Sequence, residues 1–85
     1  MKTFHLRVTS PDGDNFAGEV EMLSLRGTEG DLAIMAGHIP FVTAVVPCTL
    51  KIETEEDEIV AEVGGGILSV SAEGTVLLSS DYKVK

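Results

Sequence analysis

The sequence has 85 residues, with 14 acidic and 6 basic side chains and a formal net charge of −8. A chain of this length is expected to form one small domain over residues 1–85. The negative charge would repel phosphate backbones and anionic lipid headgroups, so no nucleic-acid partner is expected. The single cysteine, Cys48, excludes an internal disulfide and a zinc site built from several thiolates.

The first third of the chain alternates apolar and polar residues, which predicts half-buried β-strands. Residues 3–9 form the first predicted strand. A turn is predicted at residues 11–13, Pro-Asp-Gly, because proline fixes φ and glycine accepts a positive φ. A second run follows over residues 16–27, with Val20 and Met22 expected on one face.

Residues 27–40 combine two turns with one short strand. Residues 28–31, Thr-Glu-Gly-Asp, form a predicted polar and acidic turn, and residues 32–35 form an apolar strand. Glycine and proline interrupt the chain again at residues 37–40. His38 lies in this second turn, where its ring is expected to bond nearby backbone.

The second half of the chain predicts further strands and hairpins. Residues 41–46 are apolar apart from one threonine, which fits a strand buried on both faces or covered by a partner. Residues 50–63 alternate around an acidic tip at residues 54–58, which is either a solvated hairpin end or a cation site. Three glycines at 64–66 allow a sharp corner or a close crossing between sheets. Residues 67–78 form the last predicted hairpin.

The window 32–50 carries no Asp, Glu, Lys or Arg but is not expected to cross a membrane. Gly37, Pro40 and Pro47 would break a helix in lipid, and the apolar residues between them are mostly strand formers. No other window has a helical period. The sequence therefore predicts an all-β fold of about eight to ten short, mostly antiparallel strands, arranged as a two-sheet sandwich or a closed barrel.

Chemistry on a substrate is not expected. No Gly-x-Ser-x-Gly motif is present, and the serines lie in or beside predicted strands. His5, His38 and Cys48 have no spacing that would fix a metal geometry. The glycines at 64–66 precede a strand rather than a helix, which argues against phosphate binding. These observations predict a non-catalytic binding module without a metal or cofactor.

Five segments of the chain carry a recognisable family pattern. They are FAGEVE (16–21), GTEGDLAI (27–34), GHIPFVTAV (37–45), GGGILSV (64–70) and TVLLS (75–79). In these segments the chain resembles the epsilon subunit of the rotary ATP synthase, called delta in mitochondria. The resemblance covers the family's N-terminal domain, a β-sandwich of two sheets with about five strands each. The family's C-terminal helical hairpin has no counterpart in the sequence.

The resemblance implies a non-catalytic rotor subunit in the central stalk of a proton- or sodium-translocating rotary ATP synthase. Such a subunit docks on the gamma subunit and on the membrane c-ring, and it couples ion-driven rotation to ATP synthesis. It would lie at the cytoplasmic face of the cell membrane, or on the matrix or stromal side in an organelle. Its association with the membrane would be indirect, through the complex.

The resemblance also implies two sets of contact residues. The set expected to meet the c-ring is Thr28, Glu29, Gly30 and Asp31, whose carboxylates would pair with basic groups of the ring loops. The set expected to meet gamma is Ser10, His38, Phe41, Val42 and Thr43.

The alternative is a free-standing β-sandwich that serves as a binding or adhesion module. A secretory leader would favour that alternative. Residues 1–3 are followed directly by the alternating pattern of a strand, which is not typical of a leader.

Overall fold

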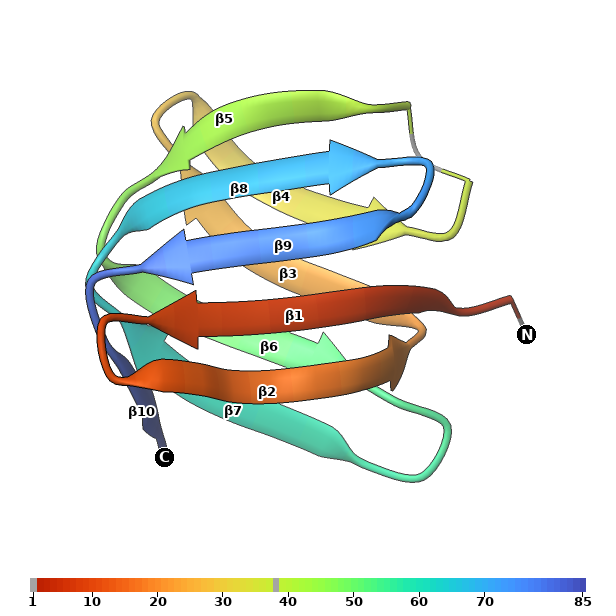
Figure 1. Ribbon diagram of the computed structural model, residues 1–85, viewed down its shortest axis with the longest axis horizontal. Helices are drawn as coiled ribbons and strands as arrows, with labels where there is room; N and C mark the ends of the chain where they lie inside the picture. Colours follow the sequence, from red (N-terminus) through yellow and green to blue (C-terminus); the bar gives the residue numbers. More distant parts are fainter. Residues whose placement is uncertain (1, 38) are drawn as a thin grey trace.

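The computed structural model describes residues 2–37 and 39–85, and the regular structure of these residues is entirely β-strand (Figure 1). The strands are β1 (Phe4–Ser10), β2 (Gly13–Val20), β3 (Met22–Gly27), β4 (Gly30–Met35), β5 (Phe41–Val45), β6 (Cys48–Glu53), β7 (Glu58–Val63), β8 (Gly66–Ser71), β9 (Gly74–Ser79) and β10 (Tyr82–Val84). The prediction of an all-β fold built from short strands is confirmed.

The strands form two layers. Hydrogen bonding joins them in the order β10-β7-β6-β3-β5-β8-β9-β1-β2, with β4 beside β3. β3 and β5 share a single ladder pair, Gly27 with Val45. At that point the hydrogen-bonded sheet passes from one layer to the other. The front layer in Figure 1 is β5-β8-β9-β1-β2, and the back layer is β4-β3-β6-β7-β10. All neighbours are antiparallel except β1 and β9, which are parallel. The two-sheet prediction is confirmed.

The core lies between the two layers. The front layer contributes Leu6, Leu68 and Leu77, and the back layer contributes Leu23 and Leu50, all of them fully buried. Burying each leucine contributes about 1.5–3 kcal/mol to folding. Since side chains alternate between the two faces of a strand, each layer also presents an outward face that the core does not occupy.

The predicted strand over residues 16–27 is two strands, which corrects the sequence interpretation. β2 pairs with β1 in the front layer, and β3 pairs with β6 in the back layer. Glu21 lies at the crossing, where its amide donates a hydrogen bond to the Glu53 carbonyl at 2.7 Å. At the crossing, the alternation of buried and exposed side chains shifts by one residue. The next buried side chain after Val20 is therefore Leu23 and not Met22. The placement of Met22 on the same face as Val20 was wrong.

β5 does not have the burial that its apolar sequence suggested. Val42 is 67% exposed and Ala44 is also exposed, so the chain leaves the outward face of this strand open. β5 pairs along its length with β8, and its ladder pairing with β3 is limited to Val45. The prediction of burial on both faces is wrong, and cover by a partner stays a prediction.

The remaining predicted hairpins are confirmed. β6 and β7 form one antiparallel pair, and β8 and β9 form another. Residues 64–66 carry the chain from the back layer to the front layer, as a close crossing requires. The sequence did not predict β10, a three-residue strand that pairs with β7.

Residues 32–37 and 39–50 lie in β4, in β5, in the first half of β6 and in the connections between them. In the part of the chain that the structure describes, no helix is long and apolar enough to cross a membrane.

Candidate functional site

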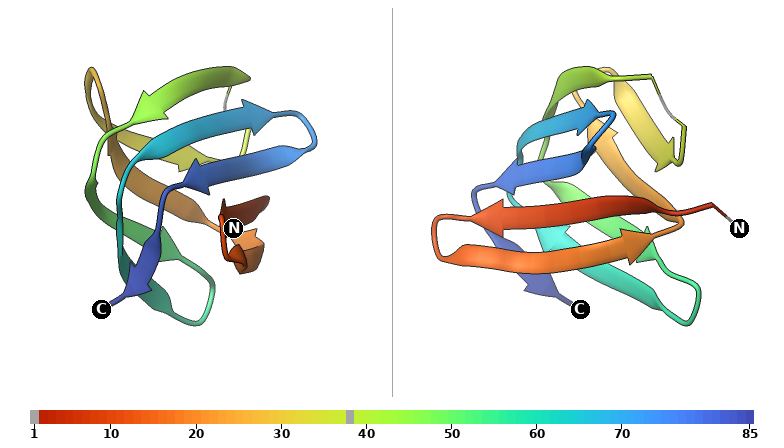
Figure 2. Two further views of the ribbon diagram at one scale, coloured as in Figure 1. Left: turned by 60° about the vertical axis from the view of Figure 1, so that its left-hand side comes forward. Right: turned by 45° about the vertical axis from the view of Figure 1, so that its right-hand side comes forward.

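The acidic turn, residues 28–31, consists of the two-residue connection between β3 and β4 and the first two residues of β4, and it lies beside the end of β5 (Figure 2). Gly27 pairs with Gly30, so Thr28 and Glu29 form the tip of the turn. Gly30 has a φ of 126°, in the region that favours glycine because a Cβ would be strained there. The predicted turn is confirmed, and its tip projects from the end of the sandwich.

Backbone contacts with the end of β5 fix the base of the acidic turn. The Thr28 amide donates a hydrogen bond to the Ala44 carbonyl at 3.3 Å, and the Val46 amide donates to the Arg26 carbonyl at 3.2 Å. A Cβ on Gly27 would lie 3.2 Å from the same Ala44 carbonyl oxygen, so the two strands approach closely. The position of the turn therefore depends on backbone hydrogen bonds rather than on its charged side chains.

The two carboxylates of the acidic turn have different surroundings. Arg26 Nε donates a hydrogen bond to Asp31 Oδ1 at 2.9 Å, although both side chains are largely exposed. This hydrogen bond and the charge of Asp31 raise the pKa of Arg26 above its usual value. Glu29 is exposed and forms no hydrogen bond or ion pair with any side chain in residues 2–37 or 39–85. One carboxylate is thus paired within the chain, and the other is open to solvent.

The residues expected to meet gamma do not share one surface. Val42 points outward from β5, whereas Phe41 and Thr43 are half-buried on its inward side. Phe41 packs against the border of the core, and Thr43 Oγ1 donates to the Ala44 carbonyl at 3.4 Å. His38 lies outside the described residues.

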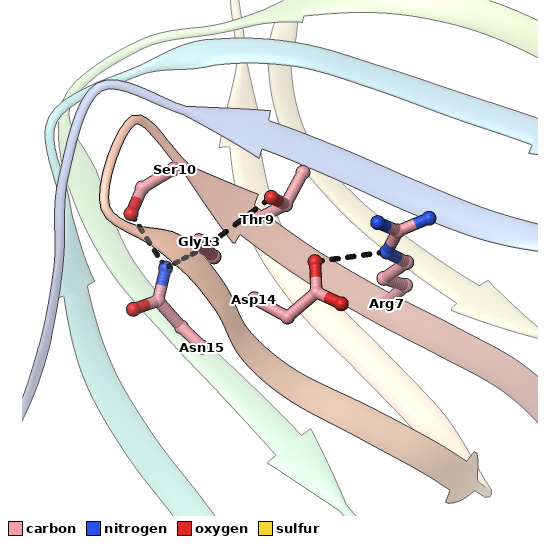
Figure 3. A network of polar contacts seen from close by, with 6 residues as sticks. All are labelled: Arg7, Thr9, Ser10, Gly13, Asp14 and Asn15. Carbon is pink, nitrogen blue, oxygen red and sulfur yellow. Dashed lines mark hydrogen bonds and ion pairs between the residues drawn. The ribbon is translucent and has the colours of Figure 1, made fainter.

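Ser10 lies in the same layer as β5 but apart from it. Its Oγ accepts a hydrogen bond from Asn15 Nδ2 at 2.8 Å, and Arg7 pairs with Asp14 nearby at 3.0 Å (Figure 3). Two strands, β8 and β9, separate β1 from β5, a distance of about 14 Å at the usual strand spacing. The structure therefore brings Ser10 to the same layer as Val42 without contact between them.

The outward side of β5, β8 and β9 carries an apolar surface that the sequence analysis missed. This apolar face consists of Val42, Ala44, Ile67, Val76 and Leu78. Ala44, Ile67 and Leu78 are direct cross-strand neighbours, and Val42 and Val76 flank Ser69 in the next row. Ile67 is 44% exposed and Leu78 is 53% exposed.

A sequence signal for the apolar face was present. The segments 67–70 and 75–78 are apolar at both odd and even positions, so an alternating strand must place some of those side chains outward. A contiguous outward apolar surface of this kind is characteristic of docking sites.

The acidic tip of the β6–β7 hairpin is stabilised by local hydrogen bonds. Thr54 and Asp57 bond to each other through backbone and side chain at 2.9–3.1 Å, and the Asp57 carboxylate accepts from the Glu58 amide at 2.9 Å. Across the described residues, no three His, Cys, Asp or Glu side chains gather as a group that could hold a metal ion. This geometry favours the solvated-hairpin interpretation of the tip.

Comparison with known proteins gives sequence matches over almost the whole chain. Residues 3–83 match the family model described as "ATP synthase, Delta/Epsilon chain, beta-sandwich domain". The ATP synthase epsilon chain of Afipia carboxidovorans is 40% identical over 81 residues, covering 93% of this chain and 58% of that protein. The epsilon chain of a Bradyrhizobium strain is 37% identical over 79 residues, with the same coverage. The chain thus spans 58% of the length of these curated relatives.

A solved structure agrees on the fold. A chain in the Euglena gracilis mitochondrial ATP synthase, from a cryo-EM structure of OSCP, F1 and the c-ring, matches with a TM-score of 0.90 at 22% identity. The match covers 96% of this chain and 53% of that chain. At this identity the likeness concerns the two-layer fold alone.

Proposed function

This chain belongs to the ATP synthase delta/epsilon chain family, and we propose that it is a non-catalytic subunit of the rotor's central stalk. It docks on the gamma subunit and on the c-ring of a proton- or sodium-translocating enzyme, and it couples ion-driven rotation to ATP synthesis. Residues 1–85 form one epsilon-type domain with no catalytic residue, metal or cofactor. The chain reaches the cytoplasmic face of the membrane, or the matrix or stromal side, only through the complex.

The observation that carries the proposal is the acidic turn. Its tip is exposed, its base is held to β5 by backbone hydrogen bonds, and Glu29 has no side-chain partner in the described residues. The backbone of the turn is held in place while the Glu29 carboxylate stays unpaired, so a basic partner can bind the carboxylate without first breaking a contact within the described residues. We assign Thr28, Glu29, Gly30 and Asp31 to contact with basic loops of the c-ring.

The proposed gamma contact centres on the apolar face, with Val42 as the residue common to both sets. Covering Val42, Ile67 and Leu78 would remove exposed apolar area from water, which favours association. The other members of the gamma set, Ser10, His38, Phe41 and Thr43, stay proposed gamma contacts, although Phe41 and Thr43 are half-buried on the inward side of β5 and Ser10 is two strands away.

The two proposed contacts are mechanically joined. Thr28 at the tip of the acidic turn bonds to Ala44, which belongs to the apolar face. Once gamma holds the apolar face, the acidic turn meets the ring at a high effective concentration. Two individually modest contacts can then act as one strong attachment, which a subunit that transmits rotation needs.

Glu29→Lys is expected to weaken binding to the c-ring about tenfold or more, since it replaces a charge-assisted contact worth roughly 1.5–3 kcal/mol with a repulsion. The measurement is a titration of the labelled chain with detergent-solubilised c-ring. Glu56→Lys is the control, because it makes the same charge change at the β6–β7 tip, at the opposite end in Figure 1. Equal losses for both variants would show that net charge, not the acidic turn, governs binding.

A further inference from the structure

We propose that Arg26 sets the charge that the acidic turn presents, because it holds the Asp31 carboxylate and leaves Glu29 as the one free acid of the turn. This inference rests on the proposed function, since it requires a basic partner to meet the turn. Arg26 would act indirectly: it determines which carboxylates of the turn the partner meets, without touching the partner itself.

The geometry of the hairpin brings the two charges together. Arg26 and Asp31 are direct cross-strand partners, one pair before the glycines that flank the tip. Their side chains lie on the outward face of the back layer, where Arg26 Nε is 2.9 Å from Asp31 Oδ1. Asp31 also helps to line a shallow hollow on that face. Asp31 is therefore directed along the face, whereas Glu29 lies at the tip.

The Arg26 side chain is not needed to hold the turn in place. The backbone hydrogen bonds of Thr28 and Val46, and the ladder between β3 and β4, fix the turn independently of the guanidinium group. An exposed ion pair contributes little to folding stability. Replacing Arg26 is therefore expected to change the charge of the turn and leave its shape intact.

Releasing Asp31 should change how strongly the turn attracts a basic surface. With Arg26 present, the charges of Arg26, Glu29 and Asp31 leave the turn one net negative charge. Without Arg26 the turn carries two negative charges, and both carboxylates can accept hydrogen bonds from the partner. Binding should then depend on Asp31 more strongly than it does in the wild type, where Arg26 holds that carboxylate.

The test is a double-mutant cycle on the full chain, with c-ring affinity measured at two salt concentrations. Asp31→Asn should weaken binding about twofold in the wild type, where Arg26 holds the carboxylate, but roughly fivefold in the Arg26→Gln background. Arg26→Gln alone should tighten binding about threefold at low salt, and less at high salt because the gain is electrostatic. Arg26→Lys should restore the behaviour of the wild type, since a cation again faces Asp31.

Two results would contradict the inference: one leaves the proposed function standing, and the other removes both. An equal effect of Asp31→Asn in both backgrounds would show that Arg26 does not mask Asp31, while the proposed function would stand if Glu29→Gln still weakens binding. If no variant and not even the folded wild type binds the ring, the proposed function itself fails and the inference fails with it. Thermal melting of each variant checks that the fold is unchanged.

Discussion

Gly66→Ala is expected to destabilise the protein by at least about 3 kcal/mol, because the added methyl group would overlap backbone atoms that cannot move without disturbing the strand pairing. Gly66 pairs with Ser79 where the chain enters the front layer. A Cβ on Gly66 would collide with the Leu78 carbonyl oxygen and lie 2.8 Å from the carbonyl carbon and 2.9 Å from Ser79 Cα. These are backbone atoms of a paired strand, so rotating a side chain cannot make room.

The melting temperature should therefore fall by roughly 12–24 °C, since 1 kcal/mol shifts it by about 4–8 °C in a domain of this size. Circular dichroism during heating measures the change. Gly18→Ala is the matched control, because Gly18 is also a strand glycine but its Cβ would meet only the Phe16 ring at 3.7 Å, an ordinary contact. A Gly66→Ala protein that melts within a few degrees of the control would show that β8 and β9 can separate there without loss.

Val42→Glu combined with Leu78→Glu is expected to reduce affinity for gamma about 100-fold or more. Each change would place a carboxylate in a contact that excludes water, at a cost of a few kcal/mol when the carboxylate is unpaired. Both side chains are largely exposed in the chain, so folding should tolerate the two changes. Calorimetric titration with purified gamma measures the affinity.

A glutamate elsewhere on the surface provides the comparison. Val84 is an exposed apolar residue of β10 at the edge of the back layer, away from the apolar face. Val84→Glu should leave gamma binding within about twofold of the wild type. If the double variant also binds gamma normally, the apolar face is not the docking surface.

Much of the fold follows from local patterns in the sequence. The hairpins β6–β7 and β8–β9 and the turn before β4 were predicted because alternation and glycine are local signals. The crossing at Glu21 was missed, because apolar and polar residues continue through it and only the choice of partner strand changes. β10 was missed because three residues carry little pattern and their pairing with β7 is non-local.

The site was predictable to a smaller extent. The position of the acidic turn was predicted, but the Arg26–Asp31 pair was not, because the sequence placed Asp31 in the turn, whereas the structure places it in β4 opposite Arg26. The apolar face was not found, because a run such as residues 75–78 looks like a strand buried on both faces until its layer is known. Similarly, Ser10 is separated from β5 by two strands, β8 and β9, and the sequence alone does not predict the order of the strands in the sheet.

The bridging role is tested most directly by using the tagged wild-type chain to capture subunits from ATP synthase extracted from membranes of its source organism. Recovery of gamma and c subunits together is the predicted result, with loss of the c subunits alone when Glu29 and Asp31 are both replaced by lysine. If the folded wild-type chain recovers neither gamma nor c subunits, the protein shares the fold of the family but does not connect shaft and ring.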